Sequence, residues 1–268
     1  ELSAHAIDSH RAAGKEDVPF KVIIPTVLNP QFSIRDYGTG MSPSDISTVY
    51  TTFFLSTKTS SNDDIGGFGL GSKTPFAYTD NFTVISYYKG VKYTYLAFKN
   101  DKGIPAISLV GTEETKECNG VEITIGVANS DITSFHKAAN WAYIAYKLKP
   151  ECNIPLDTKL EPVYFGENVF KDIPYEWAVI RRLNQYPSPT YIDMGGLIYK
   201  YNTALFDSYP NNHAILIKVP IGTFEIGTSR EDVQHSNSID SILQAMYEKI
   251  FPEIIEQVYK QFTSTGTK

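Results

Sequence analysis

The chain of 268 residues has little cysteine, only Cys118 and Cys152. Disulfide frameworks and cysteine-based metal sites need more, so this count favours a reducing cytosol. No run approaches the roughly 18 apolar residues of a membrane-spanning helix. Basic charge is also scarce: 24 Lys and Arg stand against 30 Asp and Glu, a net charge of −6, which argues against a basic surface for nucleic acid.

Apolar material is plentiful, with 42% hydrophobic and 13% aromatic residues, so the chain can bury real cores and is not a disordered one. Its length allows two small domains. The irregular, proline-containing stretch 149–162 marks the border between them. We therefore expect one domain over residues 1–150 and a second over residues 151–268.

Periodicity and turn residues predict the elements. In the first domain we expect helices at 1–13, from 42 onward and at 130–148, and strands at 19–25, 32–36, 81–88, 92–98, 105–110 and 121–127. Ser42-Pro43-Ser44-Asp45 predicts a helix start with an N-cap and Pro at the first helical position, and Lys89-Gly90 is expected to join strands 81–88 and 92–98. In the second we expect strands at 190–193, 196–201, 214–219 and 223–226 and a helix at 238–262. The helix should bury a stripe made of Ile239, Ile242, Leu243, Met246, Ile250, Ile254 and Ile255. The fold class is α/β (α+β), with helices on one face of a mixed sheet.

Two glycine-containing motifs follow each other in the first domain. Asp36-Tyr37-Gly38-Thr39-Gly40 precedes Ile65-Gly66-Gly67-Phe68-Gly69-Leu70-Gly71-Ser72-Lys73 by about thirty residues. Glycines let a backbone approach a ligand closely, and successive N–H groups leading into a helix form an anion site. The loop predicts phosphate binding by Gly66, Gly67, Phe68, Gly69, Leu70, Gly71, Ser72 and Lys73. Lys58, which precedes the loop, is a further phosphate candidate by its position.

Two better-known phosphate motifs are excluded by spacing. The P-loop needs Gly and Lys side by side before Ser or Thr, and here Ser72 separates Gly71 from Lys73. The dinucleotide fingerprint needs a preceding strand, and here the polar stretch 60–64 comes before the loop.

Asp36 offers base recognition. A buried carboxylate only accepts hydrogen bonds, so it can bind the exocyclic amine of adenine and reject guanine. Gly38 and Gly40 would let the chain turn tightly around the base. The two motifs together predict an adenine nucleotide with a phosphate chain.

These residues resemble the GHKL ATPases, the superfamily of gyrase, heat-shock chaperone, histidine kinase and mismatch-repair ATP-binding domains. Residues 1–8 (ELSAHAID) are similar to its first motif, 36–40 to its second, 54–58 to its lid, 65–78 to its glycine loop and 119–123 to its last motif. The resemblance covers about residues 1–148. It implies a Bergerat-type two-layer α/β sandwich that binds ATP, followed by a smaller α/β transducer-like domain.

The resemblance also implies roles for single residues. Glu1 would be the general base, Asp8 would support the adenine site, and Arg230 would reach the γ-phosphate from the second domain. His5 stands where the family has the Asn that ligates Mg²⁺, and Val121 where it has a Thr that bonds the adenine ring. Imidazole suits softer metals than Mg²⁺, so hydrolysis is in more doubt than binding. The family pattern starts upstream of Glu1 and continues after Lys268, so we expect a longer chain.

Residues 32–41, 53–87 and 219–233 resemble more narrowly the RIIA family of T-even bacteriophages. That resemblance implies a role in protecting infection or delaying lysis in the host bacterial cytoplasm, with a RIIB-type partner. An ATP-dependent homodimer and peripheral association with the inner membrane are further expectations from the family.

Two function classes stay open. One is a slow ATPase that drives a conformational switch, and the other is a non-catalytic, ATP-gated interaction module, favoured by His5 and Val121. A histidine kinase lacks support because no dimerising helix with a phospho-acceptor histidine precedes the domain. A gyrase-like role on DNA is disfavoured by the acidic balance.

Overall fold

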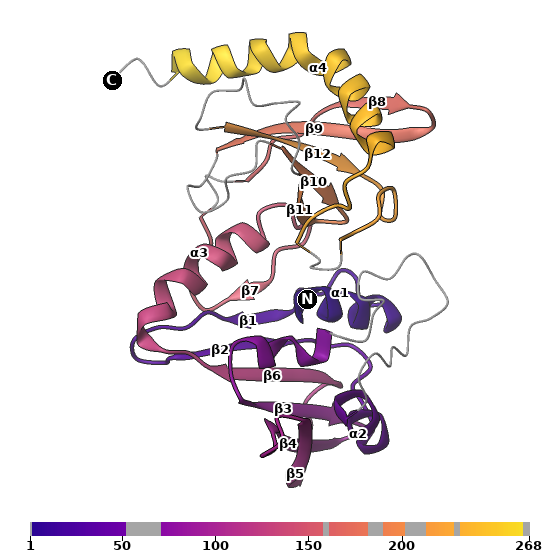
Figure 1. Cartoon of the computed structure of the whole chain (residues 1–268). Coiled ribbons are helices and arrows are strands. Elements are labelled where there is room, and N and C mark those ends of the chain that lie inside the picture. Colours follow the sequence, from indigo (N-terminus) through magenta and orange to yellow (C-terminus); the bar gives the residue numbers. More distant parts are fainter. Residues whose placement is uncertain are drawn as a thin grey trace. The chain divides into compact units, whose positions relative to one another are not determined.

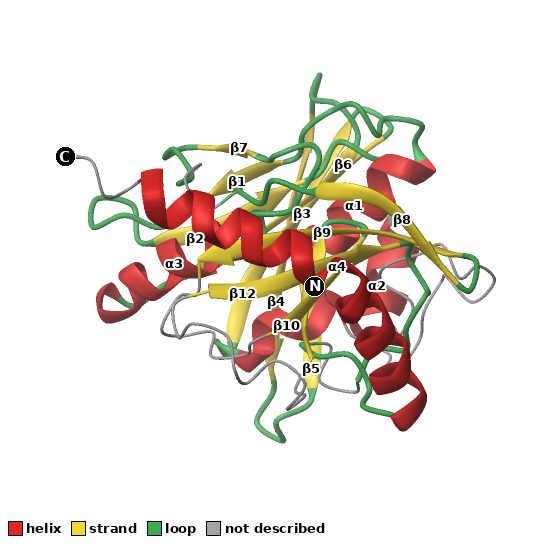
Figure 2. Ribbon diagram, turned by 90° about the horizontal axis from the view of Figure 1, so that it is seen from above, coloured by secondary structure: helices red, strands yellow, loops and turns green. Residues whose placement is uncertain are grey.

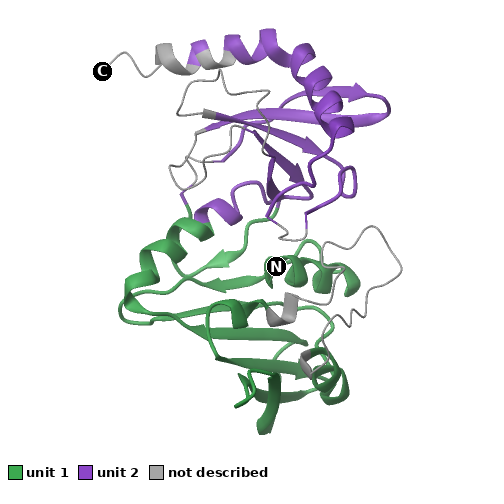
Figure 3. Cartoon of the chain, viewed as in Figure 1, with its two compact units in different colours: residues 1–139, 148–156 green, residues 140–147, 157–268 purple. Residues whose placement is uncertain are grey.

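The computed structural model describes residues 2–51, 71–157, 161–181, 190–201, 213–227 and 231–264. The chain divides into two compact units, residues 1–139 with 148–156 and residues 140–147 with 157–268 (Figure 3). This division differs from the expected border at residue 150 in two short segments. Residues 151–152 pair with a strand of unit 1, and Trp141 packs in a core of unit 2.

Unit 1 is built on a mixed sheet, whose described strands follow the order β5-β4-β3-β6-β2-β1-β7 (Figure 1). The strands are β1 (Lys21–Ile23), β2 (Gln31–Arg35), β3 (Asn81–Tyr88), β4 (Val91–Lys99), β5 (Pro105–Glu114), β6 (Gly120–Gly126) and β7 (Glu151–Cys152). Neighbours are antiparallel except β1 and β7, which are parallel. The central strand β6 therefore joins the β3–β4–β5 meander to β2.

The described helices of unit 1 are α1 (Leu2–Ala12), α2 (Pro43–Thr51) and α3 (Ile132–Ala142), of which residues 140–142 belong to unit 2, with 3-10 helices η1 (Gly71–Ala77) and η2 (Asn129–Asp131). Ile46 of α2 is fully buried in one core with Phe82 and Val84 of β3. Leu2 of α1 and Phe76 of η1 pack against the same core. Helices and sheet thus share one apolar layer, as the sequence predicted for an α/β sandwich.

Local chemistry explains where several elements begin and end. Lys89 and Gly90 both have positive φ, 51° and 78°, and join Tyr88 to Val91 in a two-residue hairpin. Ser42 caps α2: the Asp45 backbone N–H donates to its Oγ (3.2 Å), and its hydroxyl donates to the Asp45 carboxylate (2.6 Å). Pro43 then occupies the first helical position. These predicted features are confirmed.

Unit 2 contains a second sheet, whose described strands run β11-β10-β12-β9-β8. They are β8 (Phe165–Phe170), β9 (Ile173–Arg181), β10 (Thr190–Met194), β11 (Leu197–Tyr201) and β12 (His213–Val219). The long helix α4 (Asn237–Ser264) lies over one face (Figure 2). There Leu243, Met246, Ile250 and Ile254 are fully buried against residues such as Trp177 and Ile217.

Several sequence expectations were wrong in detail. Ile255 is 52% exposed, so it lies outside the buried stripe of α4. Strands β8 and β9 were not predicted, because their hairpin turns at Lys171 and Asp172, two non-glycine residues with positive φ. Helix α3 ends at Ala142 instead of Leu148. Residues 223–226 contribute a single β-bridge at Ile226, not a strand.

Within the ranges that the structure describes, no helix is both long and apolar enough to cross a membrane.

Candidate functional site

The turn after β2 places Asp36 in a buried position, 7% exposed, where three donors converge on its carboxylate. The Ser9 hydroxyl (3.0 Å) and the Gly38 backbone N–H (2.9 Å) donate to Oδ1. The Val121 backbone N–H donates to Oδ2 (3.1 Å). A carboxylate has about four acceptor positions, so this arrangement fixes Asp36 and leaves room for one more donor.

Burial raises the pKa of Asp36 above its ordinary value of 3.8. The hydrogen bonds from Gly38 and Ser9 and the positive charge of Arg35 oppose that shift, but burial is the larger effect. The carboxylate is thus held in a place where a hydrogen-bond donor from a ligand would be favoured electrostatically.

The glycines of this turn are required by close packing. A Cβ on Gly38 would collide with Ser9 of α1, and a Cβ on Gly40, whose φ is 69°, would collide with the Tyr87 carbonyl of β3. Gly120, at the start of β6, likewise has no space for a side chain beside the Asp36 carbonyl. The turn is therefore pressed between α1, β3 and β6.

Arg35 holds the backbone of this turn from the sheet side. Its guanidinium is buried, donates to the Asp36 carbonyl, and donates to the Cys118 carbonyl (2.7 Å). It also lies 3.9 Å from the ring centre of Tyr87 and 4.9 Å from that of Tyr37. A cation between two aromatic rings is a stabilising contact, so Arg35 links Asp36 firmly to the segment before β6.

The last turn of α1 and the segment after it also hold this turn. The Tyr37 N–H donates to His10 Nε2 (2.7 Å), and Lys15 Nζ donates to the Tyr37 carbonyl (2.7 Å). Ser86 of β3 completes the enclosure, since its hydroxyl donates to the Met41 carbonyl (2.7 Å) and accepts from the Met41 N–H (3.0 Å). The backbone of residues 36–41 is thus bonded on both flanks.

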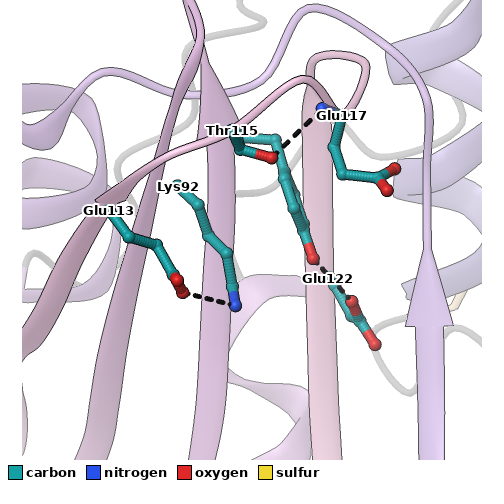
Figure 4. A network of polar contacts seen from close by, with 6 residues as sticks. Lys92, Glu113, Thr115, Glu117 and Glu122 are labelled. Carbon is teal, nitrogen blue, oxygen red and sulfur yellow. Dashed lines mark hydrogen bonds and ion pairs between the residues drawn. The ribbon is translucent and has the colours of Figure 1, made fainter.

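A network of polar side chains crosses the neighbouring strands (Figure 4). Lys92 of β4 donates to Glu113 of β5 (2.7 Å), and the Tyr87 hydroxyl donates to Glu122 of β6 (3.4 Å). Burial, followed by the charge of Glu122, raises the pKa of Tyr87 above its ordinary value of 10.0. Tyr87 is therefore a neutral phenol that connects this network to Arg35.

Helix α1 carries two further predicted site residues, Asp8 and His5. Asp8 is 2% exposed and lies 3.7 Å from Arg11 Nη1, so it is a buried, paired carboxylate. His5 is half-buried one turn earlier. Among the described residues, no three His, Cys, Asp or Glu side chains come together in a way that could hold a metal ion.

Only some of the remaining predicted site residues lie within the described part of the chain. Glu1, Lys58, Gly66, Gly67, Phe68, Gly69, Leu70 and Arg230 lie outside the described residues. Gly71, Ser72 and Lys73 form the start of η1. The end of that segment is anchored, because the Tyr78 hydroxyl donates to Asp131 (2.7 Å) and accepts from the Ala128 N–H (3.1 Å).

Sequence reasoning missed several residues that shape this site, among them Ser9, His10, Lys15 and Arg35. Ser9 and His10 directly follow the first motif, and Arg35 directly precedes the second. The position of these three residues next to a motif was the signal in the sequence that could have identified them as site residues. Their partners could not be identified without the fold, since Ser9 and His10 each contact residues 27 positions away.

Comparison with known proteins agrees with this geometry. Residues 7–123 match the family of histidine kinase-, DNA gyrase B-, and HSP90-like ATPases. The fold over both units is similar to the ATPase region of topoisomerase II from Saccharomyces cerevisiae, with a TM-score of 0.55 at 12% identity over 96% of this chain and 84% of that one. No curated protein matches the sequence. The fold is therefore the mixed α+β GHKL fold that the motifs predicted.

Proposed function

We propose that unit 1 binds ATP and ADP through a GHKL-type site and hydrolyses ATP slowly. The observation that carries this proposal is the buried Asp36 carboxylate, which receives three donors and keeps an acceptor position for an adenine amine. The family match over residues 7–123 contains this residue and supports the same reading.

The other roles in the proposal come from the sequence motifs. The phosphates would lie along residues 66–73, with Lys58 and Lys73 as positive partners. Glu1 would orient and deprotonate the attacking water, and Arg230 would stabilise charge on the γ-phosphate from the second domain. Closure on ATP would then make the protein a conformational switch.

Among the residues that the structure describes, those at the position of the family's metal ligand do not form an oxygen donor set for Mg²⁺. His5 offers an imidazole in place of the family's amide oxygen, and Asp8 pairs with Arg11. We therefore assign no step of hydrolysis to a protein-bound ion. Mg²⁺ would enter with the nucleotide, held by phosphate oxygens and water.

Calorimetric titration with ATP, ADP and GTP, with and without Mg²⁺, tests the proposal, followed by a turnover assay. ATP and ADP should bind and GTP should bind poorly. Glu1→Ala should keep ADP affinity and lose turnover by on the order of 10²–10⁴-fold. A folded protein that binds neither ATP nor ADP would sink the assignment.

The second candidate function is a non-catalytic, ATP-gated interaction module. It is favoured by His5 and by Val121, which bonds Asp36 through its backbone and carries no hydroxyl. Binding of ATP without turnover above background in the parent protein, and no effect of Glu1→Ala, would favour this function over hydrolysis.

The resemblance of three segments to the RIIA family supports a biological setting for the switch. We propose a role in infection or lysis control in the host bacterial cytoplasm, at or near the inner membrane, with a RIIB-type partner. An ATP-dependent homodimer belongs to the same proposal. Size-exclusion chromatography with and without a non-hydrolysable ATP analogue checks the homodimer, and co-purification with a RIIB-type protein checks the partner.

A further inference from the structure

His10 makes two hydrogen bonds that together define its chemical state. Its ring is buried, 3% exposed, on the last turn of α1. Nε2 accepts from the Tyr37 N–H (2.7 Å), and Nδ1 lies 2.8 Å from the Val18 carbonyl, which can only accept. Nδ1 must therefore carry the proton and Nε2 must be free to accept, which is the neutral Nδ1–H tautomer.

These bonds act on the residue between Asp36 and Gly38. Tyr37 is held at its N–H by His10 and at its carbonyl by Lys15, so its two flanking peptide planes are fixed. The second of these planes carries the Gly38 N–H, which donates to Asp36 Oδ1. A rotation at Tyr37 would withdraw that donor and turn the carboxylate away from its orientation.

We propose that His10 is a positioning residue for nucleotide binding: through Tyr37 it sets the orientation of the Asp36 carboxylate that receives the base. The proposal rests on the ATP-binding function proposed above. It adds a residue that belongs to neither glycine motif and that reaches the ligand site through Tyr37.

A graded set of variants separates the two bonds. His10→Gln can place an amide oxygen near the position of Nε2 and accept from Tyr37, whereas His10→Asn is too short to do so. His10→Ala removes both bonds. His136 is the matched control, because its Nε2 bonds a backbone carbonyl too (Pro25, 2.7 Å) but lies on α3.

Calorimetry with ADP and GDP is the readout, on proteins shown to be folded by circular dichroism. We expect ADP affinity to fall about tenfold in His10→Ala and His10→Asn, the effect of one lost hydrogen bond, and to stay within about threefold in His10→Gln. The preference for ADP over GDP should fall in parallel. His136→Gln should keep both affinity and preference, whatever its melting temperature.

The outcomes are distinct. If the parent binds no ADP, the proposed function and this inference both fail. If the parent binds ADP and His10→Asn binds it equally well with equal base preference, the inference alone is overturned. If His10→Ala does not fold, the comparison of His10→Gln with His10→Asn decides: equal affinities overturn the inference, and the expected difference supports it.

Discussion

At the scale of single residues, Asp36 is the side chain on which the hydrogen bonds of the site converge. Its two oxygens receive three donors from α1, the turn itself and β6. An Asn side chain has the same shape but only one oxygen. Whichever way the amide is turned, its NH₂ faces a backbone N–H.

Asp36→Asn is therefore expected to weaken ADP binding at least tenfold. One buried donor loses its acceptor, a cost of about 1–3 kcal/mol, and the base amine meets an NH₂ group. Calorimetry on the folded variant measures this. Unchanged ADP affinity would show that Asp36 does not contact the base.

The raised pKa of Asp36 leads to a second expectation: acidification should increase the free energy of unfolding and decrease the affinity for ADP. Between the unfolded value of 3.8 and the higher folded pKa, the folded protein holds more protons than the unfolded one. This group therefore makes the free energy of unfolding rise as the pH falls through that window. ADP affinity should fall in the same window, because a neutral carboxyl is a poorer acceptor.

Denaturant unfolding at several pH values, on the parent and on Asp36→Asn, isolates this slope. The parent's unfolding free energy, relative to that of the variant, should increase on acidification. A relative decrease would mean that hydrogen bonds, not burial, dominate the pKa of Asp36.

At the scale of elements, α4 offers a matched pair of isoleucines. Ile250 is fully buried among the strands of the second sheet, and Ile255 is 52% exposed. Ile250→Ala should lower the free energy of unfolding by about 2–5 kcal/mol through lost burial and a cavity. Ile255→Ala should change it by less than about 0.5 kcal/mol. Urea titrations of both variants measure this, and equal losses would contradict the placement of α4.

Elements with strong local signals could be predicted from the sequence, and long-range contacts could not. The β3–β4 hairpin was found from Lys89-Gly90, and α2 from Ser42-Pro43 with Asp45. The β8–β9 hairpin was missed because Lys171-Asp172 lacks the glycine that usually marks such a turn. Val121 donates to Asp36 across 85 positions, and no local pattern encodes that pairing.

For the site, too, local motifs could be recognised in the sequence and long-range contacts could not. Asp36, Gly38 and Gly40 were identified because their spacing is a motif, but the reason for both glycines is tight packing against α1 and β3. The sequence analysis assigned both Ile254 and Ile255 to the buried stripe of α4. Ile254 is buried, whereas Ile255 is exposed on another side of the helix. A stripe read from sequence is wider than the surface that the partner sheet covers.

At the scale of the whole molecule, the order along the chain and the division into units do not coincide. Residues 140–147 belong to unit 2, although residues 148–156 after them belong to unit 1. The Trp141 ring lies 4.9 Å from that of Tyr191 and packs on Ala214 and Leu216. A chain cut after residue 156 therefore keeps Trp141 and loses its partners.

We expect such a 1–156 chain to show the fluorescence emission of a water-exposed tryptophan, because Trp177, the second of the two tryptophans, is removed with unit 2. The full chain with Trp177→Phe is the comparison and should show a buried emission. Replacing Trp141 by Gln in the short chain should improve its solubility, since an exposed apolar surface favours association. A short chain with a protected Trp141 would contradict this view of unit 2.

The parallel pairing of β1 with β7 has a consequence for synthesis on the ribosome. Asn153 bonds both the N–H (2.7 Å) and the carbonyl (3.0 Å) of Ile24, so the edge of the first sheet closes only when residues 151–153 have emerged. Trp141 emerges before residues 151–153, but it can be buried only after its later partner Leu216 has emerged. The nascent chain can therefore complete its first sheet while Trp141, which belongs to the second unit, is still exposed. During that interval Trp141 would be available for binding by chaperones that recognise exposed apolar side chains.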